Sequence, residues 1–175
     1  PLGLEVGEYC VPDDENFNQA EFLKKVAEYP KCPKSSCPSP EHFMDSYNVP
    51  VDHVYAVTLS SRLSGSYNSA ELGKKLYHEK YGEKQIHVVD SESASGGETQ
   101  IALKIMELEE EGLPFGDIVK RIEEFRDSIH TYFVLDNLET LRKNGRLSGV
   151  KALVASTLSI KPVMGSKKGE IIQRS

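Results

Sequence analysis

Two clusters of serine and glycine in this sequence each follow a short apolar run and precede a helical pattern. The first is Ser60–Ser66 (SSRLSGS), directly after Val54–Leu59, and the second is Ser91–Gly97 (SESASGG), directly after Ile86–Asp90. Serine hydroxyls and unpaired backbone N–H groups at the start of a helix bind anions such as phosphate or carboxylate, and Gly65 permits close approach. Taken alone, each cluster is as typical of a helix cap as of a ligand site.

The segments around the two clusters predict how they are positioned. The apolar runs are typical of strands covered on both faces, and in the helix after the second cluster Ile101, Ile105 and Leu108 share one face. Strands that alternate with helices form parallel sheets, and open sheets of this kind bind ligands at the carboxyl ends of their strands. We therefore predict that both clusters lie at one edge of a sheet and form one anion site.

Composition excludes several classes of function. The 175 residues carry a net charge of −6, and no cluster of Lys or Arg is long enough to follow a nucleic acid. No segment approaches the roughly 18 to 20 apolar residues that cross a bilayer, and no signal-peptide pattern opens the chain. We expect no nucleic-acid partner, no stable membrane insertion and a cytoplasmic location.

Cysteine and histidine do not predict a metal or catalytic centre. Cys10, Cys32 and Cys37 are an odd number without zinc-ligand spacing, so we interpret them as reduced thiols. None of the histidines lies beside a serine in a pattern typical of a nucleophile and its base. These histidines are His42, His53, His78, His87 and His130. We predict no metal, no cofactor and no catalytic residue.

The order of the patterns predicts an α/β protein in two parts. Residues 1–128 are expected to form a three-layer domain with a parallel sheet, and residues 129–175 to begin a smaller, mixed α+β domain. The second part contains an apolar strand pattern at 131–135 and a short helical pattern at Leu138 and Leu141. It continues with a helical pattern over 150–154 and a hairpin turn at 167–169.

Five segments, in this order, resemble the DegV family of bacterial fatty-acid-binding proteins: SSCPSPEHF, SSRLSGSYNSA, VVDSESASGG, YFVLDNLETLRKNGRLSG and LSIKPV. They span residues 35–163. The resemblance implies that a long-chain fatty acid lies between the two domains. It also implies a role like that of FakB subunits, which present the fatty-acid carboxylate to a separate kinase for phosphorylation with ATP, in phospholipid synthesis. The protein would then be a carrier and not an enzyme.

The resemblance also implies which residues bind the carboxylate. The hydroxyls of Ser35 and Ser64 are expected to donate to it, with backbone N–H groups added by Gly65 and Ser66. Neutral donors suit an oxygen that later attacks ATP, because a cation held against it would stabilise the ground state and lower its nucleophilicity. Further residues are expected at the rim: Ser93, Ser95 and Arg146.

Alternative interpretations of these residues remain open. Ser93 and Ser95 are equally typical of helix caps, and Arg146 of a solvated cation after a glycine turn. Asp90 is interpreted as an acceptor for turn N–H groups rather than as an acid catalyst. Two other functions are a small phosphotransferase or hydrolase with Ser64 as its nucleophile, and a lipid-free regulatory module.

The sequence departs from the family pattern in two respects. Ser35 stands where threonine is common, which keeps the hydroxyl, and Cys37 stands where glutamine is common. Family members begin with a strand before the position of Pro1 and continue past Ser175. We therefore expect the natural protein to be longer at both ends.

Overall fold

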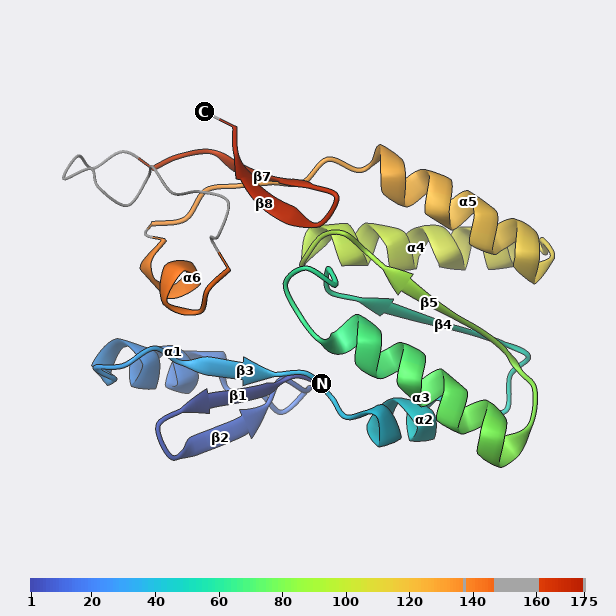
Figure 1. The fold of residues 1–175 in the computed structure, drawn as a ribbon, viewed down its shortest axis with the longest axis horizontal. Helices are drawn as coiled ribbons and strands as arrows, with labels where there is room; N and C mark the ends of the chain where they lie inside the picture. The colour runs from blue at the N-terminus through green and yellow to red at the C-terminus, as the bar shows by residue number, and fades with distance from the viewer. Residues whose placement is uncertain (137, 147–160, 175) are drawn as a thin grey trace.

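Three small sheets and six helices make up the described part of the chain (Figure 1). The structure is a computed structural model that describes residues 1–136, 138–146 and 161–174. The strands are β1 (Gly3–Val6), β2 (Tyr9–Pro12), β3 (Lys34–Ser36), β4 (His53–Thr58), β5 (Gln85–Asp90), β6 (Tyr132–Phe133), β7 (Met164–Lys167) and β8 (Glu170–Gln173). The helices are α1 (Gln19–Glu28), α2 (Pro40–Tyr47), α3 (Ser66–Tyr81), α4 (Gly96–Glu110), α5 (Phe115–Ser128) and α6 (Glu139–Lys143).

The central layer is the parallel pair β4 and β5, with α2 and α3 on one face and α4 and α5 on the other (Figure 1). Ile86 faces α2 and α3, where it packs against Tyr47 and Tyr77. Val89 faces α4 and α5 and is fully buried among residues such as Ile101. Because both faces of the sheet are covered, its strands are nearly continuous apolar runs. The predicted three-layer α/β arrangement is confirmed.

Helices α2 and α3 approach closely at Gly73. A Cβ atom at this position would lie 2.6 Å from the carbonyl oxygen of Pro40 and 2.7 Å from Cβ of Phe43. The buried hydroxyl of Tyr47 donates to the carbonyl oxygen of Ala70 over 3.1 Å, and burial raises the pKa of this phenol. The contact fixes the segment that leads out of β3 against the helix that follows β4.

The amino-terminal sheet, with strand order β2-β1-β3, is antiparallel and was not anticipated from the sequence. Its strands are only three or four residues long, and all three residues of β3 are exposed. Segments this short carry too few buried positions for an alternating pattern to be recognised. The pairing has a consequence for the site, because Leu4 and Ser35 are direct cross-strand partners in it.

The carboxyl-terminal sheet, with strand order β6-β7-β8, contains the predicted hairpin. Its two-residue turn is Lys168 and Gly169, with φ of +50° and +76°, as a primed hairpin turn requires. The predicted strand at 131–135 and short helix near Leu141 are confirmed as β6 and α6, although β6 covers only two residues. The helix predicted over 150–154 lies outside the described residues.

A carboxylate joins α4 to β4 at the amino end of the parallel strands. Glu109 Oε1 accepts a hydrogen bond from Tyr55 over 2.6 Å and lies 2.7 Å from His53 Nδ1. The hydrogen bond from Tyr55, together with the contact to His53, lowers the pKa of Glu109 below its ordinary value of 4.5. The stability contributed by Glu109 is therefore present above pH 4.5 and is lost as the pH falls through the lower folded-state pKa.

Replacement of Glu109 by glutamine should remove this pH dependence. We expect a loss of about 0.5–1 kcal/mol in unfolding free energy at pH 7, because the pair is partly exposed, and a smaller difference from the unsubstituted chain at pH 3.5. Urea unfolding of both proteins at the two pH values measures this difference in unfolding free energy. Replacement of the exposed neighbour Glu110 by glutamine is the control. Equal differences at both pH values would contradict the prediction.

Candidate functional site

The two serine-rich clusters meet at the carboxyl edge of the parallel sheet. The Ser60 N–H donates to the carbonyl oxygen of Ser93 over 2.9 Å, and the Ser91 N–H donates to that of Thr58 over 3.3 Å. These contacts confirm the prediction that both turns lie at one edge. In Figure 1 the arrowheads of β4 and β5 point toward the other two sheets, so the turns lie where the three sheets come together.

Asp90 organises this edge, as the sequence predicted. Its Oδ1 accepts hydrogen bonds from the backbone N–H groups of Ser61, over 3.0 Å, and Glu92, over 3.1 Å. One carboxylate oxygen therefore satisfies an N–H group from each turn. Glu92 has a φ of +50°, which is uncommon for a residue with a side chain, so this acceptor also helps to hold a tight backbone conformation.

A cavity of about 850 Å³ lies between β3, the turn after β4 and the end of α6. Most of its lining is apolar, but it also contains serine, asparagine and arginine side chains, and it is called the polar cavity for these residues. It is lined by the predicted residues Ser35, Ser64, Gly65 and Arg146, which come from three separate segments. Ser35 faces it from the same side of the amino-terminal sheet as its partner Leu4, which also lines the cavity. The structure therefore brings together four of the residues that the sequence singled out.

Ser66 lies differently from the expectation. It is buried, is not part of the cavity lining, and its N–H donates to Ser64 Oγ over 3.2 Å. The two serine hydroxyl oxygens are 2.9 Å apart. Ser64 Oγ thus accepts a backbone hydrogen bond, and its own proton is available to a ligand when Ser66 is the donor in the contact between the two hydroxyls. The geometry favours Ser66 as a residue that positions Ser64, because α3 begins here and its first N–H groups need acceptors.

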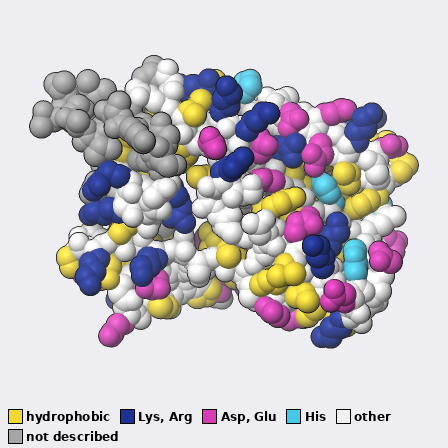
Figure 2. Space-filling model, in the orientation of Figure 1, with side chains coloured by type: hydrophobic (Ala, Val, Ile, Leu, Met, Phe, Trp, Pro, Cys, Tyr) yellow, Lys and Arg dark blue, Asp and Glu magenta, His cyan; other side chains and the backbone are white. Residues whose placement is uncertain are grey.

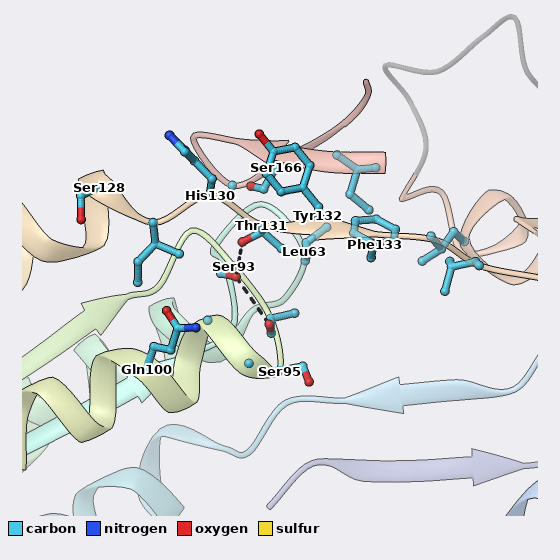
Figure 3. Close-up of a pocket in the computed structure, with 18 of the residues that line it drawn as sticks. Leu63, Ser93, Ser95, Gln100, Ser128, His130, Thr131, Tyr132, Phe133 and Ser166 are labelled. Atoms are coloured by element: carbon cyan, nitrogen blue, oxygen red, sulfur yellow. Dashed lines mark hydrogen bonds between the residues drawn. The ribbon is translucent and has the colours of Figure 1, made fainter. Parts of the chain in front are cut away.

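A second, mainly apolar cavity of about 750 Å³ adjoins the first (Figure 3). Leu63 and Leu141 line both cavities, so the polar and the apolar space share a wall of two leucines. The apolar cavity is bounded further by side chains of α5, β6 and β8, among them Phe125, Phe133 and Ile171. A molecule with a polar head and a long apolar tail matches this pair of cavities.

The predicted rim residues Ser93 and Ser95 line the apolar cavity rather than the polar one. Ser93 Oγ lies 2.6 Å from Thr131 Oγ1, and Figure 3 shows the two side chains pointing toward each other. Ser95 is the cap of α4: its N–H donates to Glu98 Oε1 over 2.9 Å within a capping box. The capping interpretation is therefore confirmed for Ser95, whereas Ser93 joins the turn after β5 to the residue just before β6.

Arg146 lies in the polar cavity beside the shared wall. Its Nε donates to the carbonyl oxygen of Leu63 over 3.1 Å. That bond uses one edge of the planar guanidinium and turns the remaining N–H groups toward other acceptors. No described ion pair involves this side chain.

Some lining residues were not found from the sequence. Thr131 and Ser166 reach the apolar cavity from the carboxyl-terminal sheet, and Asn68 and Asn144 reach the polar one from α3 and the end of α6. Its place as the first residue of a predicted strand was the only available signal for Thr131. The other three lie in segments whose position depends on contacts between distant parts of the chain.

Three negative findings apply to the part of the chain that is described. No three side chains of His, Cys, Asp or Glu gather there as a metal site would require, and the three cysteines are free thiols. None of the described helices combines the length and the apolar composition needed to cross a bilayer. Within the described residues, the Ser64 hydroxyl contacts Ser66 and has no hydrogen bond to a histidine or carboxylate that would activate it as a nucleophile.

The protein family follows from the whole-chain match. Residues 1–174 match the model of the family described as "Uncharacterised protein, DegV family". The chain belongs to the DegV family. A DegV domain-containing protein from Streptococcus gordonii is 34% identical over 163 residues, which are 93% of this chain and 58% of that protein. The chain thus spans about three fifths of the length of the curated relatives it matches.

Solved structures of DegV proteins share the fold. A DegV-family protein from Ruminococcus gnavus, refined with vaccenic acid, is 53% identical with a TM-score of 0.96, over 99% of this chain and 62% of that one. The Streptococcus pneumoniae Fatty Acid Kinase (Fak) B3 protein, loaded with linoleic acid, is 31% identical with a TM-score of 0.93, over 100% of this chain and 62% of that one. DegV proteins of this fold thus hold fatty acids as ligands.

Proposed function

We propose that this DegV chain is the fatty-acid-binding part of a carrier that presents a long-chain fatty acid to a partner kinase. The observation that carries the proposal is the pair of adjoining, largely apolar cavities that share Leu63 and Leu141, one of which also contains the serines Ser35 and Ser64. The carboxylate would bind to the hydroxyls of Ser35 and Ser64 and to the N–H of Gly65. The acyl chain would extend past the two leucines into the apolar cavity.

The energetics suit such a ligand. Transfer of the acyl chain from water is favourable by about 0.8 kcal/mol for each CH₂ group, so the tail supplies most of the affinity. The hydroxyl donors then set the position of the head group. Ser64 Oγ accepts the Ser66 N–H, and when the Ser66 hydroxyl also donates to it, the Ser64 proton can be donated to a carboxylate oxygen. Neutral donors leave that oxygen nucleophilic enough to attack ATP.

The kinase partner is supported by similarity to the Fak B3 protein of Streptococcus pneumoniae. In this proposal the DegV chain has no catalytic residue, and phosphoryl transfer takes place at the kinase. Because the partner kinase would use ATP, we propose that the protein acts in the cytoplasm, where ATP is available. Arg146, whose guanidinium lies beside the head-group position, would meet the transferred phosphoryl group or the kinase surface.

Native mass spectrometry of protein purified from cells tests lipid binding. We expect an added mass that matches a long-chain fatty acid, lost on denaturation. An apoprotein mass, together with no uptake of added oleate, would contradict the proposal. Intrinsic ATP hydrolysis by the purified protein without a partner would instead favour the phosphotransferase alternative.

Replacement of Arg146 by alanine tests presentation to the kinase. We expect phosphorylation of the bound fatty acid by the partner kinase to slow about tenfold, because one charge-assisted contact to a phosphoryl oxygen is lost. Fatty-acid occupancy should stay near that of the unsubstituted protein. Lysine at this position is the control: it keeps the charge, and part of the rate should return. A normal rate with alanine would show that Arg146 faces solvent only.

A further inference from the structure

A third cavity, of about 580 Å³, lies beside the apolar one and against the β7–β8 hairpin. Five residues line both cavities, among them Ser93 and Thr131, whose side chains are in contact, so the two cavities are direct neighbours. The third cavity shares no lining residue with the polar cavity that contains Ser35 and Ser64. Figure 2 shows Lys and Arg side chains gathered at the top of the molecule, where Figure 1 places this hairpin.

The charged groups of this cavity do not cancel. Its lining contains the cations Arg126, Lys167, Lys168 and Arg174 and the carboxylates Glu92 and Asp127, and His130 adds a titratable ring. Arg126 is already neutralised, because its Nη2 lies 2.8 Å from Asp127 and 3.0 Å from Glu123, a residue outside the lining. Three cations then face one carboxylate. This excess of positive charge is local, because the whole chain carries a net charge of −6.

The hairpin that carries three of these cations is anchored to the rest of the fold, although their side chains are exposed. Ser60 Oγ donates to the carbonyl oxygen of Gly169 over 3.0 Å, and Ser166 Oγ donates to that of Glu92 over 2.8 Å. The turn is therefore anchored to both strand-to-helix turns of the parallel sheet. Lys168 has a φ of +50° within the turn, and Arg174 lies over the ring of Tyr132, with its Cζ 5.7 Å from the ring centroid. Neither lysine forms an ion pair with a described carboxylate.

We propose that this cavity binds a phosphate group. Two lysines and one arginine, opposed by Glu92 alone, match the charge of a phosphate dianion, and Arg174 can offer two parallel N–H groups to its oxygens. The volume exceeds that of the group itself, so a phosphate ester with a larger remainder fits as well. The proposal does not depend on the fatty-acid site, because no residue assigned to the carboxylate takes part in it.

The test is a double replacement of Lys167 and Lys168 by glutamine in the full chain. Equilibrium dialysis with radiolabelled inorganic phosphate at low ionic strength should show binding that the double variant weakens about tenfold. Replacement of Lys75 and Lys120 by glutamine removes the same charge from exposed helix positions and should leave binding unchanged. Thermal unfolding of both variants checks that they fold.

A second arm distinguishes free phosphate from a lipid head group. Vesicles of phosphatidylglycerol and of phosphatidylcholine are tested by flotation with the same variants. Binding of the phosphatidylglycerol vesicles alone, lost in the Lys167 and Lys168 variant and kept in the control, supports the site with a head group as its ligand. Binding of neither probe, or equal binding by both double variants, overturns the proposal. Native mass spectrometry of the same samples reports fatty-acid binding separately.

Discussion

Replacement of both Ser35 and Ser64 by alanine should weaken fatty-acid binding about 100-fold. A hydrogen bond to a charged group contributes about 1.5–3 kcal/mol, and about 1.4 kcal/mol corresponds to a factor of ten in affinity, so each single replacement should cost about tenfold. The effect is large because the carboxylate would lose both hydroxyl donors and remain in a site from which water is partly excluded. The tail would still favour binding, so the loss is not complete.

Titration with a fluorescent fatty acid measures this effect, and native mass spectrometry checks the occupancy after purification. Replacement of Ser46 by alanine is the matched control, because its hydroxyl donates to the carbonyl oxygen of His42 on the surface of α2, outside the cavities. Urea unfolding should show that the double variant folds normally. If its affinity equals that of the control, the carboxylate binds at another position and the head-group assignment is wrong.

Replacement of Gly73 by valine should destabilise the fold by about 3 kcal/mol, at the upper end of the range for overpacked sites. The added Cβ would meet the Pro40 carbonyl at 2.6 Å and Phe43 Cβ at 2.7 Å. Because one of these atoms belongs to the backbone, no side-chain rotation relieves the clash, and α2 must move away from α3. That movement would also shift the loop after Ser35 relative to Ser64, so the affinity for fatty acid should fall as well.

The urea midpoint, with an unchanged dependence on denaturant, measures the loss of stability. Gly116 offers a matched control, since a Cβ there has no atom within 4 Å, and its replacement by valine should change stability by less than about 0.5 kcal/mol. If the two valine variants unfold at the same urea concentration, the close approach of α2 and α3 does not limit this fold.

The parallel layer could be predicted because its signals are local. The runs before Ser60 and Ser91 are apolar, each precedes a helical period, and these features place both turns at one sheet edge without knowledge of distant contacts. The role of Asp90 followed for the same reason, since it needs only the N–H groups of its own turn and the neighbouring one. The hairpin at Lys168 and Gly169 could be predicted for the same reason, because its turn residues are adjacent in the sequence.

The amino-terminal sheet and part of the site could not be predicted in this way. Strand β3 has three exposed residues, and its pairing with β1 joins segments about 30 residues apart, so no periodic pattern marks it. The contact between Ser93 and Thr131 depends on how the two parts of the chain pack. The division at residue 128 itself stays a prediction. The resemblance, and not periodicity, pointed to Ser35, and it did not distinguish the buried Ser66 from the exposed Gly65.

The hydrogen bond from Ser60 to Gly169 joins residues 109 positions apart. During synthesis from the amino end, the first partner leaves the ribosome long before the second. Until the hairpin arrives, the leucines and aromatic rings that it helps to cover stay in contact with water. Nascent or prematurely ended chains are therefore expected to be aggregation-prone, and under the proposed function capture of a lipid would be one of the last steps of maturation.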